Sequence, residues 1–277
     1  MPFAELNDAR IYYELNGEGM PLVQVPGAAT GMQGYRGITP LMASSFRVLD
    51  FDPQGYGRSS ISSEGYGYEV WSRDMASLID HVGFDEFVMH GGSMGSTLAL
   101  DFVARNPGRV THLVLSGCTA KLDTMSRAQF RTWKALAHAY GIGSRELADC
   151  MASHSLTRDF LDGPAGGEAF IDQLAAQVAK TVTIDAFMGA CDYLIGVDVT
   201  PELDKVTVPT LVMVGDQDAI TPANQGPSGA GARSVYEGLV NAPRREYLVL
   251  EGSAHSNLRD VPDVCAEAIR AFVSQDA

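Results

Sequence analysis

The chain has 277 residues, 45% of them hydrophobic, which suffices for one large domain or two small ones around a real core. Its 20 basic residues against 34 acidic ones give a formal net charge of −14. A charge of this sign repels nucleic acid phosphate and anionic membrane surfaces, so it argues against both as partners and favours a small-molecule ligand.

Apolar patterning predicts the first strands and the first long helix. Residues 3–16 alternate apolar and polar side chains and end in a turn at 16–19, as an antiparallel ribbon at a sheet edge does. The continuous run at 21–25 predicts a strand buried on both faces, and 46–51 predicts the next strand. Apolar side chains at 68–82 fall on one helical face, and Gly83 suits the end of that helix.

The stretch from Phe87 onward is a strand that breaks into a turn and restarts as a helix. Ser93 is the centre of a G-x-S-x-G motif, with Gly91 two residues before it and Gly95 two residues after it. Strand and helix cross so tightly at such a turn that a Cβ at either glycine would clash, and the serine hydroxyl is pushed into the open. The motif is meaningful only between a strand and a helix, and a helical pattern follows at 94–105.

Strand and helix signals continue to alternate up to a strand at 110–116, and then the pattern changes. From about 120 to 205 helical periodicity continues without a convincing strand, which predicts a helical cap inserted after one strand. Sheet pattern returns at 210–215 and 246–250, with a helix near 235–240 between them and a final helix through Phe272. The glycine-rich piece 226–231 lacks the Lys-Ser/Thr of a phosphate loop and is interpreted as a flexible loop. Such alternation predicts a parallel sheet with helices on both faces.

With the Ser93 turn, the alternation around it and the inserted helices, the chain resembles the α/β-hydrolase superfamily, in the branch of small capped esterases, lactonases and carbon–carbon bond hydrolases. The resemblance covers nearly the whole chain. It implies an α/β fold with a mostly parallel eight-stranded sheet. It also implies a core of residues 1–120 and 206–277 and a helical cap of residues 121–205.

Three polar side chains follow predicted strands, where ligands of an open parallel sheet bind. Ser93, Asp218 and His255 occur in the chain order serine, acid, histidine that the resemblance implies for a catalytic triad. A serine hydroxyl is a weak nucleophile, so an imidazole must take its proton and a buried carboxylate must fix the imidazole tautomer. Of the six histidines, only His255 lies in a loop after the last strand. The alternative is a solvent-exposed loop histidine.

The catalytic acid has three candidates. The turn from Gly215 to Asp218 resembles the family's G-x-x-D turn, in which Asp218 matches the catalytic position. Asp216, directly after the strand, is the main rival. A carboxylate at that place often only accepts hydrogen bonds from loop amides. Asp123, after the strand that leads into the cap, is a weaker rival.

An acyl-transfer intermediate needs N–H donors for its oxyanion, usually two backbone amides. The resemblance implies the amide after the nucleophile, Met94, and one from the loop after the strand at 21–25, which by position is Ala28. Relatives usually carry His-Gly in that loop, whereas this chain has Pro26-Gly27 and lacks a side chain that normally braces it. The later segment from Asp52 to Ser59 is interpreted as a structural turn beside the site.

These features predict a serine hydrolase that needs no cofactor or metal and cleaves a small, partly hydrophobic carboxylic ester or lactone. The cap supplies apolar candidates for the substrate pocket, which would equally serve to attach the cap to the sheet: Phe130, Trp133, Phe187 and Tyr193. One alternative is a carbon–carbon bond hydrolase of a ring-cleavage product, and another is a ligand-binding protein that kept the fold without turnover.

The remaining expectations concern state and compartment. The four cysteines are far apart and show no C-x-x-C spacing, so we expect reduced, buried thiols and a cytoplasmic monomer or homodimer. The first residues show no basic region followed by an apolar run, and no segment reaches the roughly 20 apolar residues that span a bilayer.

Overall fold

The computed structural model describes residues 3–275, and one sheet forms the centre of this part of the chain. Its eight strands have the order β1-β2-β4-β3-β5-β6-β8-β10. The strands are β1 Phe3–Leu6, β2 Ala9–Asn16, β3 Met20–Val25, β4 Phe46–Phe51, β5 Phe87–Gly92, β6 Val110–Ser116, β8 Thr210–Gly215 and β10 Arg245–Leu250. β2 pairs antiparallel with β1 and β4, and the other pairs are parallel. The predicted mostly parallel eight-stranded sheet is confirmed.

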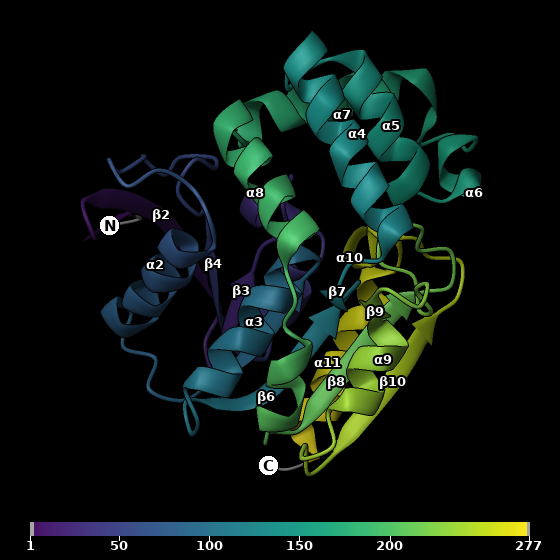
Figure 1. The fold of residues 1–277 in the computed structure, drawn as a ribbon. Helices are drawn as coiled ribbons and strands as arrows, with labels where there is room; N and C mark the ends of the chain where they lie inside the picture. The colour runs from purple at the N-terminus through teal and green to yellow at the C-terminus, as the bar shows by residue number, and fades with distance from the viewer. Residues whose placement is uncertain (1–2, 276–277) are drawn as a thin grey trace.

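Helices cover both faces of this sheet because its strands are apolar on both sides. In β3, for example, Leu22 packs into one buried cluster and its neighbour Val23 into the other. In Figure 1, α2, α3 and α9 lie in front of the sheet and α11 lies behind it. The helices outside the cap are α1 Thr39–Met42, α2 Tyr68–His81, α3 Met94–Arg105, α9 Ala232–Gly238, α10 Asn257–Asp260 and α11 Pro262–Ser274, with a 3-10 helix η1 at Gly31–Tyr35.

Five helices, which we call the cap helices, lie between the short strand β7 (Thr119–Lys121) and β8 and sit over the carboxyl ends of the strands (Figure 1). They are α4 Thr124–Tyr140, α5 Arg145–Ser155, α6 Arg158–Leu161, α7 Gly167–Thr181 and α8 Ile184–Gly196, followed by the 3-10 helix η2 Thr200–Lys205. Their starts are encoded locally, since the side chain before each of four helices accepts a hydrogen bond from its first turn. These N-cap residues are Asp123, Ser144, Thr157 and Thr183.

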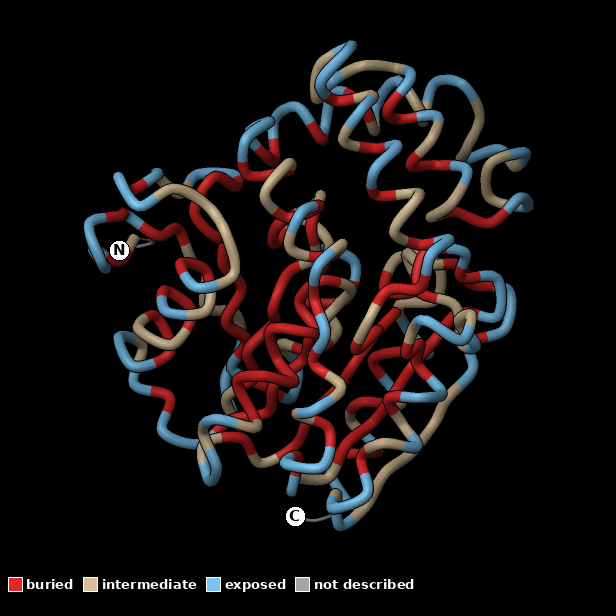
Figure 2. Tube along the Cα trace, viewed as in Figure 1, coloured by how far each residue is buried: buried red, intermediate tan, exposed pale blue. Residues whose placement is uncertain are grey.

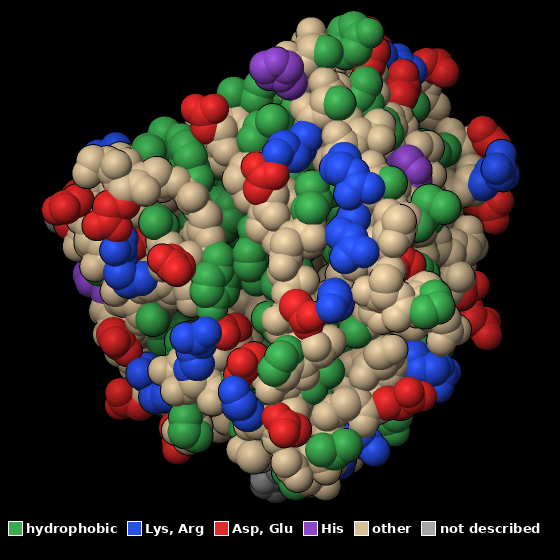
Figure 3. Space-filling view, in the orientation of Figure 1, with side chains coloured by type: hydrophobic (Ala, Val, Ile, Leu, Met, Phe, Trp, Pro, Cys, Tyr) green, Lys and Arg blue, Asp and Glu red, His purple; other side chains and the backbone are tan. Residues whose placement is uncertain are grey.

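Burial follows this layered plan. The central strands β3, β4, β5, β6 and β8 and the helix α3 are largely buried, whereas the outer turns of the cap helices alternate between buried and exposed residues (Figure 2). On the face shown in Figure 3, acidic and basic side chains are scattered among other groups. Within residues 3–275 no helix combines the length and the apolar character that crossing a membrane requires.

The structure corrects two expectations about the chain after the cap. The glycine-rich piece 226–231 is not wholly a flexible loop, because Ala230–Gly231 forms a strand, β9, that pairs antiparallel with β7. The helix expected near 235–240 forms earlier, at Ala232–Gly238. The four cysteines are free thiols as expected, but Cys150 is only partly buried.

Candidate active site

Ser93 occupies the sharp turn between β5 and α3. Its φ of 54° and ψ of −121° lie in a region that L residues rarely adopt, and such a conformation costs about 1–3 kcal/mol. The two flanking glycines make this turn possible. A Cβ on Gly95 would lie 1.9 Å from the carbonyl oxygen of Val25, and one on Gly91 would lie 2.5 Å from the carbonyl oxygen of Gly95. The small residues that the motif requires are therefore forced by backbone contacts on both sides of the serine.

The structure brings the three predicted triad residues together. His255, in the loop between β10 and α10, has its Nε2 atom 2.9 Å from Ser93 Oγ. Its Nδ1 atom lies 2.9 Å from Asp218 Oδ2. With the proton on Nδ1, that nitrogen donates to the carboxylate and Nε2 is free to accept the serine proton. The arrangement is therefore a continuous relay from an open hydroxyl to a buried acid.

Asp218 is well suited to remain charged at the end of this relay. Its side chain is fully buried, and burial alone would raise its pKa. The charge of His255 and hydrogen bonds from His255 and from the backbone N–H groups of Thr221 and Ile220 outweigh burial, so the pKa of Asp218 is lowered.

The two rival acids are used elsewhere. Asp216 is exposed, and its Oδ1 accepts a hydrogen bond from the backbone N–H of Ser253, 3.1 Å away. Asp123 caps α4 by accepting from the backbone N–H of Ser126 and also holds the glycine-rich loop through the backbone N–H of Gly226. Both carboxylates therefore satisfy loop amides, and neither contacts His255.

Two neighbours of the relay were not predicted from the sequence. The hydroxyl of Thr221 lies 3.0 Å from Asp218 Oδ2, 3.1 Å from His255 Nδ1 and 2.8 Å from the carbonyl oxygen of Gly117. Gly117 has a φ of +54°, and a Cβ there would lie 3.2 Å from the imidazole of His255. The one local signal is position, since Thr221 follows Asp218 by three residues, the spacing at which a turn threonine can bond back to an aspartate.

The segments that carry the two predicted oxyanion donors, Ala28 and Met94, both adjoin Ser93. Met94 begins α3, and the first N–H groups of a helix have no acceptor within that helix. The loop that carries Ala28 approaches the serine closely, because a Cβ on Gly27 would lie 3.2 Å from Ser93 Cβ. Although Pro26 offers no bracing side chain, Tyr56 donates a hydrogen bond of 2.8 Å to the carbonyl oxygen of Ala28. The turn interpreted as structural therefore supplies a brace for this loop.

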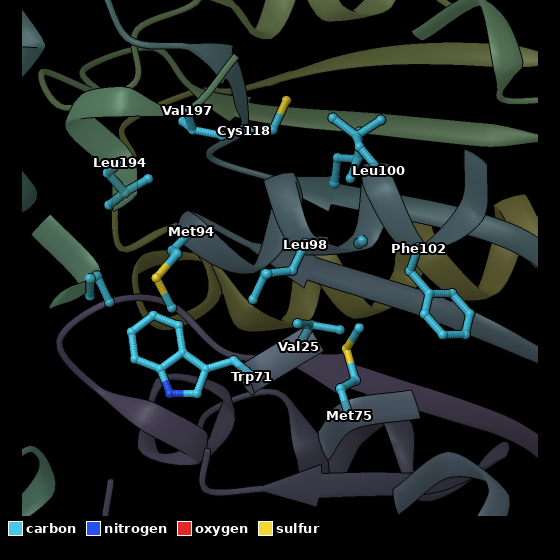
Figure 4. Close-up of a cluster of buried hydrophobic side chains, with 14 of the residues drawn as sticks. Val25, Trp71, Met75, Met94, Leu98, Leu100, Phe102, Cys118, Leu194 and Val197 are labelled. Atoms are coloured by element: carbon cyan, nitrogen blue, oxygen red, sulfur yellow. The ribbon is translucent and has the colours of Figure 1, made fainter. Parts of the chain in front are cut away.

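Side chains of α3 fix the turn at Ser93 by packing into the buried core. Figure 4 shows Met94 and Leu98 on the side of α3 that faces Trp71 and Val25, inside the main buried cluster. Met94 has no exposed surface, so its backbone N–H is held in place by packing around its own side chain.

Ser93 and His255 line a cavity of about 350 Å³ beneath the cap helices. Of the four cap residues expected to line it, Phe130 and Trp133 do. Phe187 instead stacks behind Trp133, and Tyr193 stacks on Tyr68 and donates to Thr97 Oγ1. The other large apolar side chains of the lining were not predicted: Tyr35, Met151, Leu156, Phe170, Leu174, Ile220 and Leu258. A ligand that reaches Ser93 therefore contacts apolar groups of the cap on one side and loops of the sheet domain on the other.

The chain belongs to the alpha/beta hydrolase fold family, whose model matches residues 20–260. It is 24% identical to 3-oxoadipate enol-lactonase 2 of Acinetobacter baylyi, over 82% of this chain and 79% of that one. It is 26% identical to 2-hydroxy-6-oxononadienedioate/2-hydroxy-6-oxononatrienedioate hydrolase 1 of Dechloromonas aromatica, over 85% of this chain and 81% of that one. The crystal structure of the enol-lactonase from Burkholderia xenovorans has a TM-score of 0.81 at 22% identity and covers 99% of this chain and 100% of its own. The fold of the chain is therefore shared over its full length.

Proposed function

We propose that this protein is a serine hydrolase that cleaves a small, partly hydrophobic carboxylic ester or lactone. Ser93 is the nucleophile, His255 the general base and then acid, and Asp218 the group that orients the imidazole. The backbone N–H groups of Ala28 and Met94 receive the oxyanion. The observation that carries the proposal is the relay of two 2.9 Å hydrogen bonds from Ser93 through His255 to Asp218.

The chemistry follows from that relay. Ser93 Oγ attacks the substrate carbonyl carbon while its proton passes to His255 Nε2, and the carbonyl oxygen becomes an oxyanion held by the two amides. When the tetrahedral intermediate collapses, the imidazolium returns the proton to the departing alkoxide and an acyl-serine remains. Water then attacks the acyl-serine with His255 as the base, which releases the carboxylic acid and restores the serine.

The choice of an ester or lactone rests on two supports. The cavity of about 350 Å³ suits a small molecule, and its apolar cap lining suits a partly hydrophobic one. A relative is named an enol-lactonase. Another relative is named a hydrolase of an oxo-dienedioate, which keeps cleavage of a carbon–carbon bond as the second candidate.

A substrate panel distinguishes these candidates. Wild-type protein, Ser93→Ala and Ser155→Ala are assayed with short esters, lactones and vinylogous 1,5-diketones. Ser155 is the matched control, because it is another serine of the same cavity that lies outside the relay. We expect turnover of esters or lactones that Ser93→Ala loses and Ser155→Ala retains. Turnover of the diketones alone would move the assignment to the second candidate, and turnover of nothing by the wild type would favour the non-catalytic alternative.

A further inference from the structure

A second cavity, of about 490 Å³, lies beside the first and differs from it in chemistry. The cap helix α7 forms one wall, and the other is formed by η1, β2 and the turn after β4. Its lining includes three cations, Arg36, Arg58 and Lys180, and one acid, Asp52. In a chain with a net charge of −14, a cavity with more cations than acids is an exception to the overall field.

The wall contributed by α7 is an exposed face of that helix with three polar side chains. Gln173, Ala176, Gln177 and Lys180 all line the cavity, and their spacing of three, four and seven residues puts them on one face of the helix. All four are exposed, whereas Val178 on another face is buried. The face of α7 that lines this cavity is therefore its solvated one, where a polar ligand can bind without displacing packed side chains.

The cations are brought together by the backbone. The N–H of Gly57 donates to the carbonyl oxygen of Thr181 at 2.7 Å, and this bond joins the turn that carries Arg58 to the end of α7 that carries Lys180. Arg58 is held by stacking over the Tyr12 ring at 4.6 Å and by donating to the Tyr12 hydroxyl at 2.7 Å. Within residues 3–275 neither Arg36 nor Lys180 forms an ion pair. Their donors are therefore available to a ligand.

Two acids lie near these cations, Asp52 and Glu14, and each accepts hydrogen bonds from the protein. Asp52 is 2% exposed, and its oxygens accept hydrogen bonds from the backbone N–H groups of Met32 and Arg58. Glu14 accepts from the Tyr12 hydroxyl at 2.6 Å. Glu14 does not line the cavity, and with one acid against three cations the lining carries more positive than negative charge.

The two cavities share a border. Gln33, Arg36 and Gln177 line both of them. A ligand with its carbonyl group at Ser93 can therefore continue past the two glutamines and reach the cations with its far end.

We propose that the second cavity binds an oxyanion, a carboxylate or a phosphate, at the far end of the substrate, with Arg36, Arg58 and Lys180 as the recognising groups. This inference rests on the proposed ester or lactone hydrolysis and specifies its substrate as one that is apolar at the scissile carbonyl and anionic at the opposite end.

The test compares matched p-nitrophenyl esters of increasing chain length that end in a methyl group, a carboxylate or a phosphate. The readout is the ratio of kcat/KM for each anionic ester to that of the methyl-terminated p-nitrophenyl ester of the same chain length. We expect the ratio to peak at one chain length and to fall with added salt. The carboxylate and phosphate series show which oxyanion the cavity prefers.

Substitutions then assign the preference to the cavity. Lys180→Gln and Arg36→Gln should each lower the peak ratio about three- to fivefold, the size expected for a partly exposed ion pair, and the double variant should lower it further, to the preference that Arg58 alone supports. Arg131→Gln is the control, because Arg131 is an exposed cation of α4 that lines neither cavity. An equal fall in Arg131→Gln would assign the effect to net charge and overturn the proposal.

The failure of this inference can be told from failure of the proposed function. If the wild type hydrolyses the methyl-terminated esters and shows no anion preference at any chain length, the proposed hydrolase activity is supported and the proposed oxyanion site is contradicted. If no ester is hydrolysed, calorimetric titration of Ser93→Ala with the same series still tests the second cavity. Binding of anionic but not methyl esters supports the site, and equal or absent binding contradicts it.

Discussion

Asp50, next to the last residue of β4, is a buried carboxyl group outside the relay. It is 3% exposed. Its Oδ2 accepts a hydrogen bond from Thr39 Oγ1 at 3.0 Å, while its Oδ1 atom has no hydrogen-bond partner among the described residues. Burial raises the pKa of Asp50 to about 7 despite the bond from Thr39, and the nearby charge of Glu14 adds to the rise. The native protein therefore takes up a proton here that an unfolded chain would release.

The substitution Asp50→Asn removes this titration. With a pKa of 3.8 in the unfolded chain and about 7 in the folded one, the group lowers stability progressively as the pH rises between these values. At about 1.4 kcal/mol per pH unit, the full effect is about 4 kcal/mol, absent below pH 3.8 and complete above about pH 7. Asparagine is neutral throughout, so the variant should gain on the wild type as the pH increases.

Urea unfolding of both proteins at about pH 5 and about pH 8 measures this difference. Asp85→Asn, at an exposed aspartate in the loop before β5, is the matched control and should show no such trend. We expect the free energy of unfolding of Asp50→Asn relative to wild type to rise by about 3 kcal/mol between the two pH values. An equal difference at both pH values would refute the reasoning from burial.

Three further predictions concern the relay and its support. Asp218→Asn should lower kcat about 10⁴-fold because the imidazole adopts the wrong tautomer, whereas Asp216→Asn should mainly lower the melting temperature. If Asp216→Asn destroys turnover and Asp218→Asn does not, the acid is misassigned. Activity should rise with pH in one step, because only a neutral His255 accepts the serine proton. Asp218 stays ionised, since its pKa is lowered. A flat rate profile from about pH 5 to 8 would contradict this. The Arg259 guanidinium lies over the rings of Phe160 in α6 and Phe170 in α7, at 4.1 Å and 5.3 Å. Arg259→Gln should therefore destabilise the protein by about 1–3 kcal/mol and speed proteolysis of the cap helices, with Arg259→Lys intermediate. Unchanged proteolysis would rule out this contact as an anchor of the cap.

Local pattern was enough to predict the elements that carry the site. The strands β3 to β6 and the helix α3 are short-range features, because each is a run of apolar side chains ended by glycine or proline within a few residues. The rule that ligands bind beyond the carboxyl ends of parallel strands then selects Ser93, Asp218 and His255, which the structure brings within hydrogen-bonding distance. Their catalytic roles stay predictions.

Features that depend on contacts between distant segments could not be read from the chain. The strand β9 exists because it pairs with β7, more than a hundred residues earlier, and nothing in the glycine-rich piece itself encodes that partner. Likewise the apolar faces of the cap helices are visible in the sequence, but which of them faces Ser93 is decided by how the helices cross. This is why the same reasoning was right for Phe130, which lines the cavity, and wrong for Phe187, which stacks behind Trp133.

The brace of the oxyanion loop shows the same limit. The sequence reveals that Pro26 departs from the family pattern, but the replacement support comes from Tyr56, whose hydroxyl reaches the carbonyl oxygen of Ala28 from a different turn. A fully buried tyrosine in a glycine-rich turn is a weak signal by itself. Only the folded structure shows what its hydroxyl contacts.

The central claim is that Ser93 is a nucleophile activated by His255. Mass spectrometry after treatment with a fluorophosphonate tests it most directly, because the probe bonds covalently only to an activated serine hydroxyl. We predict one adduct per chain, mapped to the peptide that contains Ser93, strongly slowed in His255→Ala and absent in Ser93→Ala. Labelling of another serine, or labelling of Ser93 at the same rate in wild type and His255→Ala, would contradict the account.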